Sequence, residues 1–260
     1  MRSARGSRAY ASSFDLRTSG QVSAVKDQGS CGSCWAFASM ASLESSLLPG
    51  ESWNFSENNL KNTHGYDWGP CEGGLGYLAA GYLLRQAGPV NETDDPYNPS
   101  GGVSPSGLTV QKHVQEVTML PARSGSSDNN YIKEALTTIG AVDASMYWTD
   151  AAYRSATTSF YYSGSESTNH DVTIVGWDDN YSKSNFSPVP AGNGAFLIKN
   201  SWGTSWGSSG YFWISYYDSK IAEETFIFHD AEATTNYSRV YQYDPLGWVG
   251  SIGYSAKTAW

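Results

Sequence analysis

Apolar residues in the first third of the chain recur at every third or fourth position, the spacing of one helix face. The clearest series is Ala36, Met40, Leu43 and Leu47. It predicts an amphipathic helix over residues 34–48, directly after a glycine-containing loop. Pro49 and Gly50 end this helix, because proline cannot continue it and glycine suits the turn that follows.

Two shorter helices are predicted in the same α-rich part. Ser56 is a suitable N-cap for a helix through Lys61, since its hydroxyl oxygen can accept an N–H of the first turn. Apolar residues within 73–87 repeat with helical spacing up to the stop formed by Gly88 and Pro89. Residues 91–107 are rich in proline and glycine and are predicted to be a connection.

Alternating and β-branched runs replace the helical period in the second half. They predict strands within 108–120, 141–147, 170–177, 194–199 and 211–216, and one helix near 130–139. An α-rich part followed by a β-rich part indicates an α+β protein with two lobes, 14–107 and 108–217. Ligand sites favour such lobe interfaces, so we expect a cleft there. Two ranges lie outside these lobes. Residues 1–13 are interpreted as a tag, linker or processed segment without a signal-peptide core, and residues 218–260 as a C-terminal extension that is aromatic and turn-rich from about Ala231 onward.

Composition excludes several classes of function. The 260 residues contain 16 Lys and Arg against 25 Asp and Glu, a formal net charge of −9. A general nucleic-acid-binding protein needs a basic face, so we expect no nucleic-acid partner. No apolar run approaches the roughly 20 residues of a membrane span, so we expect none. With 14% aromatic and 16% charged residues, the chain has enough apolar surface to form a packed core.

The sequence contains three cysteines, an odd number. In a secreted protein the unpaired one forms an intermolecular bond or is a free thiol, whereas a cytosolic protein can hold three reduced cysteines without a function. Cys34 lies where the loop enters the helix predicted over 34–48, and unpaired first-turn amides favour a thiolate there. The alternative is that Cys34 is a small buried apolar residue.

The surroundings of Cys34 favour the nucleophile. Residues 31–35 read Cys-Gly-Ser-Cys-Trp, a signature whose nucleophile is followed by a histidine about 130–150 residues later and by an asparagine. His170 follows Cys34 by 136 residues, and Asn200 follows in an Asn-Ser-Trp-Gly sequence. Over residues 14–217 the chain therefore resembles the papain-like cysteine peptidases. The resemblance implies a helical left lobe and an antiparallel, β-barrel-like right lobe, with the active site between them.

The resemblance also implies a role for each matching residue. Cys34 is the nucleophile and His170 the acid and base, which together imply a lowered pKa for the Cys34 thiol. Asn200 orients the imidazole ring, and Trp202 shields their hydrogen bond from water. The side chain of Gln28 donates to the oxyanion of the intermediate. The alternatives are an ordinary loop glutamine and a structural histidine.

The resemblance assigns substrate binding to a second set of residues. Gly73 and Gly74 match a clamp for the substrate backbone, where a missing Cβ allows close approach; alternatively they admit the following helix. Leu75 and Gly76 border the pocket for the second residue before the scissile bond. The remaining members of this set are Asn169, Asp171 and Trp202.

Asp171 departs from the family pattern, which usually places a small residue after the histidine. Its side chain either points into the second pocket and selects polar or basic residues, or turns away to bond the backbone. The extension 218–260 is similar to the layout of bacterial and archaeal cell-surface peptidases in which a lectin-like domain follows. It is interpreted as a linker or as the first strands of such a β-domain.

Cys31 and Cys71 match a pair that is bridged in the family, which leaves Cys34 as the free thiol. A bridge indicates an oxidising compartment, so we expect an extracellular or cell-surface protein. No inhibitory prodomain precedes Phe14, so the sequence predicts a mature or trimmed form whose prodomain is a separate partner.

The resemblance implies a cysteine endopeptidase that hydrolyses proteins or peptides through a Cys34 thioester. No metal or other cofactor is expected, since the chain has no His-Glu-x-x-His motif and its Cys31 and Cys34 pair lacks a second ligand pair. One alternative is a surface binding or processing module with a papain fold and little turnover, against which the intact set of catalytic residue types argues. Another is thioester transfer to an amine, which the motifs do not separate from hydrolysis.

Overall fold

The computed structural model describes residues 9–237, 239, 241 and 246. Its helices are α1 (Cys34–Leu47), α2 (Glu57–Thr63), α3 (Gly76–Leu84) and α4 (Asn130–Thr138). Its strands are β1 (Ser13–Asp15), β2 (Lys112–Met119), β3 (Val142–Met146), β4 (Tyr153–Arg154), β5 (Ser159–Phe160), β6 (His170–Asp178), β7 (Ala195–Lys199), β8 (Tyr211–Ser215) and β9 (Thr225–Ala233). Helix α2 begins as predicted, with the Ser56 hydroxyl accepting the Asn59 N–H at 2.9 Å.

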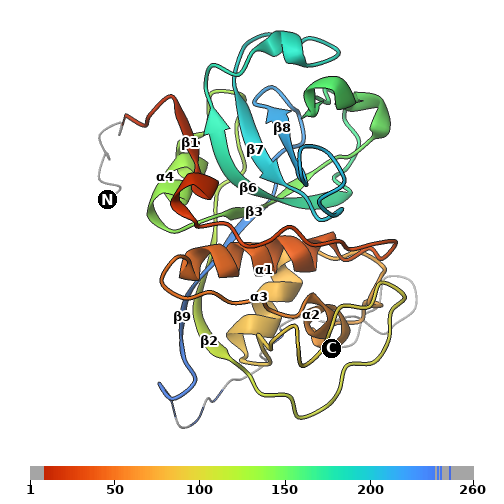
Figure 1. Cartoon of the computed structure of the whole chain (residues 1–260), viewed down its shortest axis with the longest axis vertical. Helices are drawn as coiled ribbons and strands as arrows, with labels where there is room; N and C mark the ends of the chain where they lie inside the picture. The colour runs from red at the N-terminus through yellow and green to blue at the C-terminus, as the bar shows by residue number, and fades with distance from the viewer. Residues whose placement is uncertain (1–8, 238, 240, 242–245, 247–260) are drawn as a thin grey trace, which may run out of the picture.

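The strands form one sheet in the order β2-β9-β3-β6-β7-β8-β5-β4, with β1 added beside β6. All pairings are antiparallel except β5 with β8, which is parallel. Within the described residues the two end strands, β2 and β4, do not pair with each other, so the sheet is open rather than a closed barrel. Figure 1 shows the upper lobe built on β6, β7 and β8, the lower lobe on α2 and α3, and α1 crossing between them. The predicted two-lobed α+β fold is confirmed.

Helix α1 is not amphipathic, contrary to the prediction from its apolar series. Every residue from 35 to 45 is buried, because the helix lies between the lobes and packs on both. Two of its serines bond to the opposite lobe: the Ser39 hydroxyl donates to Asp143 Oδ2 at 2.8 Å and the Ser42 hydroxyl to the Ala141 carbonyl at 2.7 Å. Buried hydroxyls need such partners, so these serines are interface residues rather than a solvated face.

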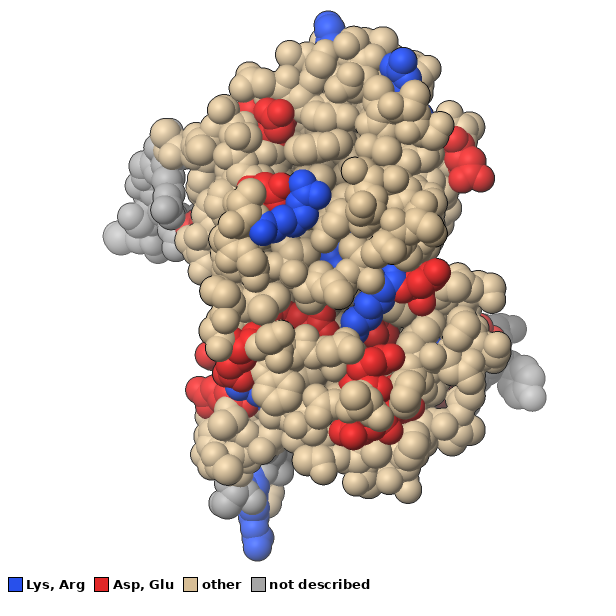
Figure 2. Space-filling view, viewed as in Figure 1, with Lys and Arg blue, Asp and Glu red and all other residues tan. Residues whose placement is uncertain are grey.

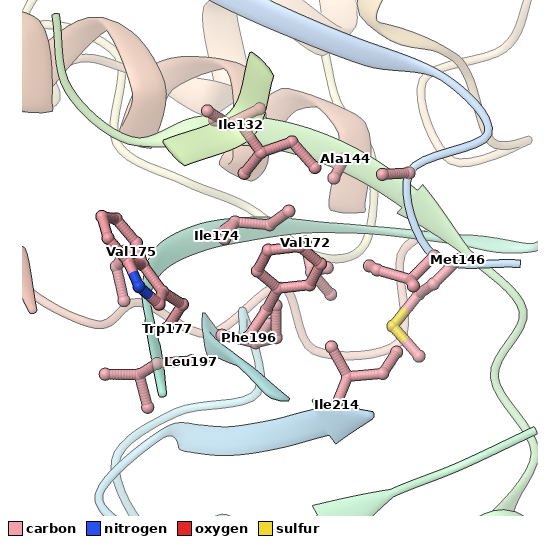
Figure 3. Packing of buried hydrophobic residues seen from close by; sticks show 14 of the residues in the cluster. Ile132, Ala144, Met146, Val172, Ile174, Val175, Trp177, Phe196, Leu197 and Ile214 are labelled. Atoms are coloured by element: carbon pink, nitrogen blue, oxygen red, sulfur yellow. The ribbon is translucent and has the colours of Figure 1, made fainter. Parts of the chain in front are cut away.

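Each lobe has its own hydrophobic core. In the right lobe α4 packs on β3 and β6, and Figure 3 shows Ile132, Ala144, Met146, Val172, Ile174, Phe196 and Ile214 in this core. The left-lobe core joins α1 and α3 to β2 and β9, and includes Trp35, Met40, Leu43, Leu78, Tyr82, Val114, Phe226 and Phe228. The left-lobe core takes up the apolar residues of α1, while β3 and β6 of the right lobe pack on its serines, which gives its first residue a defined place between the lobes.

Strand β9 corrects the expectation that residues 218–260 lie outside both lobes. It pairs with β2 along most of its length and with β3 at its start. Phe226 and Phe228 on this strand are buried in the left-lobe core, and in Figure 1 β9 and β2 run together from the upper lobe to the lower one. Residues 238, 240, 242–245 and 247–260 of the predicted extension, and residues 1–8 of the predicted leading segment, lie outside the described residues.

Acidic side chains predominate on the face in Figure 2, where Asp and Glu gather at the junction of the lobes and over the lower lobe. Few basic residues lie among them in this view. Of the helices in the described part of the chain, none combines the length and apolar character needed to cross a bilayer.

Candidate active site

Cys34 is the first residue of α1, so its sulfur lies at the end of the helix where backbone N–H groups are unpaired. The preceding loop is held by a disulfide between Cys31 and Cys71, and the Gly32 N–H donates to the Cys71 carbonyl at 3.3 Å. A Cβ on Gly32 would lie 2.6 Å from that carbonyl oxygen, so the close approach requires glycine. The predicted bridge is confirmed, and Cys34 is the free cysteine.

His170 begins β6 and Asn200 follows the last residue of β7, which brings their side chains together. His170 Nε2 lies 2.9 Å from Asn200 Oδ1. Because a carbonyl oxygen only accepts, Nε2 carries the proton, and Nδ1 of the neutral ring is left as an acceptor. The indole of Trp202 stacks on the imidazole, with 4.8 Å between ring centres and 23° between ring planes.

A cleft of about 330 Å³ joins the two lobes at this point. It is lined by Gly32, Cys34, Trp68, Glu72, Gly73, Gly74, Leu75, Thr168, Asn169, His170 and Asp171. Cys34 from the left lobe and His170 from the right therefore face the same space. Most of the predicted substrate-binding residues lie in this lining, and Gly76 and Trp202 do not.

The two glycines of the predicted clamp differ in their surroundings. Gly73 has a φ of +93°, and a Cβ there would have no heavy atom within 4 Å, so it faces open space. Gly74 instead packs against the ring of Trp35, and Gly76 packs against Phe226. These contacts favour a substrate role for Gly73 and helix packing for Gly74 and Gly76.

The carboxamide of Gln28 is held from both ends. Its Oε1 accepts from the Ser201 hydroxyl at 2.6 Å, and its Nε2 donates to the Cys31 carbonyl at 2.8 Å. The amide nitrogen has a second N–H, which is left for a ligand. Ser201 was not predicted, although its place in the Asn-Ser-Trp sequence was the available signal.

The side chain of Asn169 is engaged with the neighbouring backbone. Its Oδ1 accepts the Trp148 N–H at 2.6 Å and its Nδ2 donates to the Trp148 carbonyl at 3.1 Å. The Trp148 ring in turn contacts Trp202 at 4.7 Å. Asn169 therefore anchors an aromatic cluster beside His170, and its carboxamide already has two partners.

Asp171 lies beside a second buried acid that the sequence analysis missed. Register pairs Asp171 with Ser145 and Asp143 with Thr173, so both carboxyl groups share the sheet face that meets α1. Burial, and then the negative charge of Glu224, raise the pKa of Asp171 to about 7. Burial and the charge of Asp171 also raise the pKa of Asp143. Finding this pair required the strand register, which spacing in sequence does not supply.

Burial controls the protonation of the two central groups. It raises the pKa of the Cys34 thiol to about 12, with a further contribution from the charge of Asp171, and N–H groups of Asp171 and Trp35 oppose this shift. Burial lowers the pKa of His170 to about 4, and the hydrogen bond to Asn200, which favours the charged ring, opposes this shift. The direction for Cys34 is opposite to the expected one, because loss of water outweighs the helix amides. Desolvation thus favours the neutral thiol and the neutral imidazole in the free enzyme.

Comparison with known proteins gives a family match over most of the chain. The model described as papain family cysteine protease matches residues 10–228. Cathepsin L1 of Drosophila melanogaster is 33% identical over 215 residues, covering 76% of this chain and 52% of the relative. A viral cathepsin of Choristoneura fumiferana defective polyhedrosis virus is 31% identical over 207 residues, covering 76% and 57%. The chain thus spans about half the length of these curated relatives.

Solved structures of papain-family proteases share the fold of this chain. The clostridial cysteine protease Cwp84 after propeptide cleavage superimposes with a TM-score of 0.77 at 31% identity, covering 86% of this chain and 59% of that one. Bromelain from Ananas comosus has a TM-score of 0.67 at 24% identity, covering 85% and 99%, and supports the fold alone. The family match, the sequence relatives and the shared fold together show that this chain belongs to the papain family of cysteine proteases.

Proposed function

We propose that this protein is a cysteine endopeptidase that hydrolyses peptide bonds through a thioester on Cys34. The observation that carries the proposal is the meeting of Cys34 and His170 in one cleft from opposite lobes. The hydrogen bond of 2.9 Å to Asn200 leaves the acceptor nitrogen of His170 free for the thiol proton. Nucleophile, base and orienting group are the three parts that such a reaction needs.

Acylation follows from these positions. The Cys34 sulfur attacks the substrate carbonyl carbon while its proton passes to His170 Nδ1. The oxyanion then accepts hydrogen bonds from the second N–H of the Gln28 carboxamide and from the Cys34 backbone N–H. Collapse of the tetrahedral intermediate breaks the C–N bond, and His170 gives its proton to the departing amine.

Deacylation repeats these steps with water. Neutral His170 takes a proton from water as the oxygen attacks the thioester, and it returns the proton to sulfur as the C–S bond breaks. The products are a carboxylic acid and the free thiol. An amine in place of water would give acyl transfer, so the ratio of the two products in the presence of an added amine distinguishes these alternatives.

Substrate selection is proposed to involve Asp171. In the described part of the chain no hydrogen bond competes with a ligand for its carboxyl group, which supports the pocket-facing alternative. A basic side chain would offset the desolvation that disfavours the ionised form of this acid, because the carboxylate would gain a charged partner. We expect a preference for basic residues in the second position before the scissile bond.

The setting of the enzyme is proposed from two observations. The Cys31–Cys71 bridge is typical of an oxidising compartment. A similar solved chain contains the protease and lectin-like domains of Cwp84, a surface layer associated protein of Clostridium difficile. Both support an extracellular or cell-surface location. The family match supports protein substrates, and the propeptide cleavage of the similar Cwp84 structure supports an inhibitory propeptide as a partner.

The test compares wild type with Cys34→Ala and Cys34→Ser on an unfolded protein and on a peptide library. We expect cleavage by wild type, none by the alanine variant, and a loss of at least about a thousandfold for serine, a far weaker nucleophile. Circular dichroism checks that all three fold. Equal cleavage by Cys34→Ala would contradict the proposal, and binding of peptides by wild type without turnover would favour the binding module.

A further inference from the structure

The connection predicted over residues 91–107 packs against the loop that carries Gln28. It is anchored on α2, where Asp95 accepts from Asn58 Nδ2 at 2.7 Å and from Asn59 Nδ2 at 3.0 Å. It is also packed against the loop, since a Cβ on Gly29 would lie 2.9 Å from Pro99 Cβ. The residues between Asp95 and Pro99 are thus held at both ends.

Tyr97 lies between these anchors, and its hydroxyl joins two points of the catalytic loop. The oxygen lies 2.8 Å from the Gln28 carbonyl and 2.6 Å from the Ser33 hydroxyl. The carbonyl can only accept, so the single Tyr97 proton goes to Gln28 and the Ser33 hydroxyl donates to Tyr97. The result is a chain of two hydrogen bonds from residue 33 to residue 28.

The ring of Tyr97 is held as firmly as its hydroxyl. It contacts Phe37, one turn after Cys34 on α1, edge-on at 4.7 Å, and Lys61 Nζ lies 5.7 Å from its centre. The Tyr97 N–H also donates to Glu92 Oε1 at 2.8 Å. Burial raises the pKa of Tyr97 to about 12, so the hydroxyl keeps its proton and remains a donor at neutral pH.

Of the two residues that Tyr97 joins, one carries a proposed oxyanion donor and the other directly precedes the residue that carries the second. Gln28 supplies the side-chain donor, and Ser33 directly precedes Cys34, which supplies the backbone N–H. Gly29 and Gly32 lie between them in a loop whose middle is fixed by the Cys31–Cys71 bridge, and Tyr97 adds a direct link between its two ends. We infer that Tyr97 is a positioning residue for the oxyanion site, which holds these two donors at a set separation. This inference rests on the proposed peptidase function.

The principal variant is Tyr97→Phe, which keeps the ring and removes the two hydrogen bonds. Because the donors act on the oxyanion, which is absent from bound substrate, we expect kcat to fall about tenfold while KM stays within about twofold. The affinity for a peptide aldehyde, whose adduct with Cys34 carries a similar oxygen, should fall by the same factor. Alkylation of Cys34 by iodoacetamide, which forms no oxyanion, should keep its wild-type rate.

Tyr82→Phe is the matched control. It removes a buried tyrosine hydroxyl that bonds Asn59 Oδ1 at 2.6 Å, and its partner is on α2 rather than on the catalytic loop. We expect a similar loss of thermal stability and unchanged kcat. Equal losses of kcat in the two variants would show a merely structural role and overturn the inference. A slower alkylation of Cys34 in Tyr97→Phe would overturn it as well.

A double-mutant cycle with Gln28→Ala tests the stated route. If Tyr97 acts through the Gln28 donor, adding Tyr97→Phe to the Gln28→Ala variant should lower kcat by less than about twofold. Full additivity would contradict the inference. A wild type that cleaves peptides alongside an unimpaired Tyr97→Phe rejects this inference alone, whereas a wild type that neither cleaves peptides nor binds the aldehyde rejects the proposed function.

Discussion

Replacing Asp171 with asparagine removes an ionisable group buried beside the proposed nucleophile Cys34, and its effect on stability has a definite sign. Burial raises the pKa of this carboxyl from 3.8 to about 7. Between these values the folded protein binds more protons than the unfolded chain, so the free energy of unfolding falls as pH rises. At 1.4 kcal/mol per pH unit between 3.8 and 7, the loss reaches about 4 kcal/mol at pH 7.

Urea unfolding of wild type and Asp171→Asn at pH 4 and pH 7 measures this loss. We expect nearly equal free energies of unfolding at pH 4, and a variant more stable by about 4 kcal/mol at pH 7. Asp128→Asn is a control of opposite sign, since bonds from Ser124 lower the pKa of Asp128 and its replacement should destabilise at pH 7. The reasoning is refuted if Asp171→Asn gives the same difference from wild type at both pH values.

Three further predictions concern the reaction and the bridge. Gln28→Ala should lower kcat by about 100- to 1000-fold in steady-state assays because an oxyanion donor is lost; a change confined to KM would contradict its role. The activity kcat/KM on a substrate without ionisable side chains should rise through about pH 4, since His170 must be neutral to accept the thiol proton. An acid limb near the ordinary histidine pKa of about 6.5 would contradict this. Thiol titration after denaturation without reductant should find one free thiol, and three free thiols would reject the bridge. Reducing the Cys31–Cys71 bridge, which spans 40 residues, should lower the free energy of unfolding in urea by about 4 kcal/mol.

Much of the fold was predictable because its signals are local. Helix α4 and the strands β3, β6, β7 and β8 lie where apolar spacing predicted them, within a few residues. Helix α1 also lies where predicted, but its burial on all sides depends on a second lobe that packs against it. The sequence of residues 34–48 alone does not indicate that a second lobe packs against the helix.

Strand β9 shows a different limit. Its apolar run Thr-Phe-Ile-Phe is short and is followed by polar residues, so the local pattern resembles a turn-rich segment. What makes it a strand is pairing with β2, more than a hundred residues earlier in the chain. Pairing at that distance is decided by the fold and leaves little trace in local spacing.

The site divides in the same way. Cys34, His170, Asn200 and Gln28 were identified because they belong to short sequence motifs. Tyr97 and Asp143 lie in other segments and became visible only through contacts across the fold, whereas Ser201, which bonds Gln28, stands within the Asn200 motif. The direction of the Cys34 pKa was missed for a related reason, since the helix N-terminus is a local feature whereas desolvation depends on everything that packs around the sulfur.

The proposed reaction requires Cys34 to form a thioester with the acyl part of the substrate. Mass spectrometry of enzyme quenched in acid during turnover of a slowly deacylated peptide ester tests it most directly. We expect a wild-type mass increased by that of the acyl group, mapped to the peptide that contains Cys34 and absent from Cys34→Ala. Turnover without any acylated enzyme, or an acyl group on another residue, would contradict it.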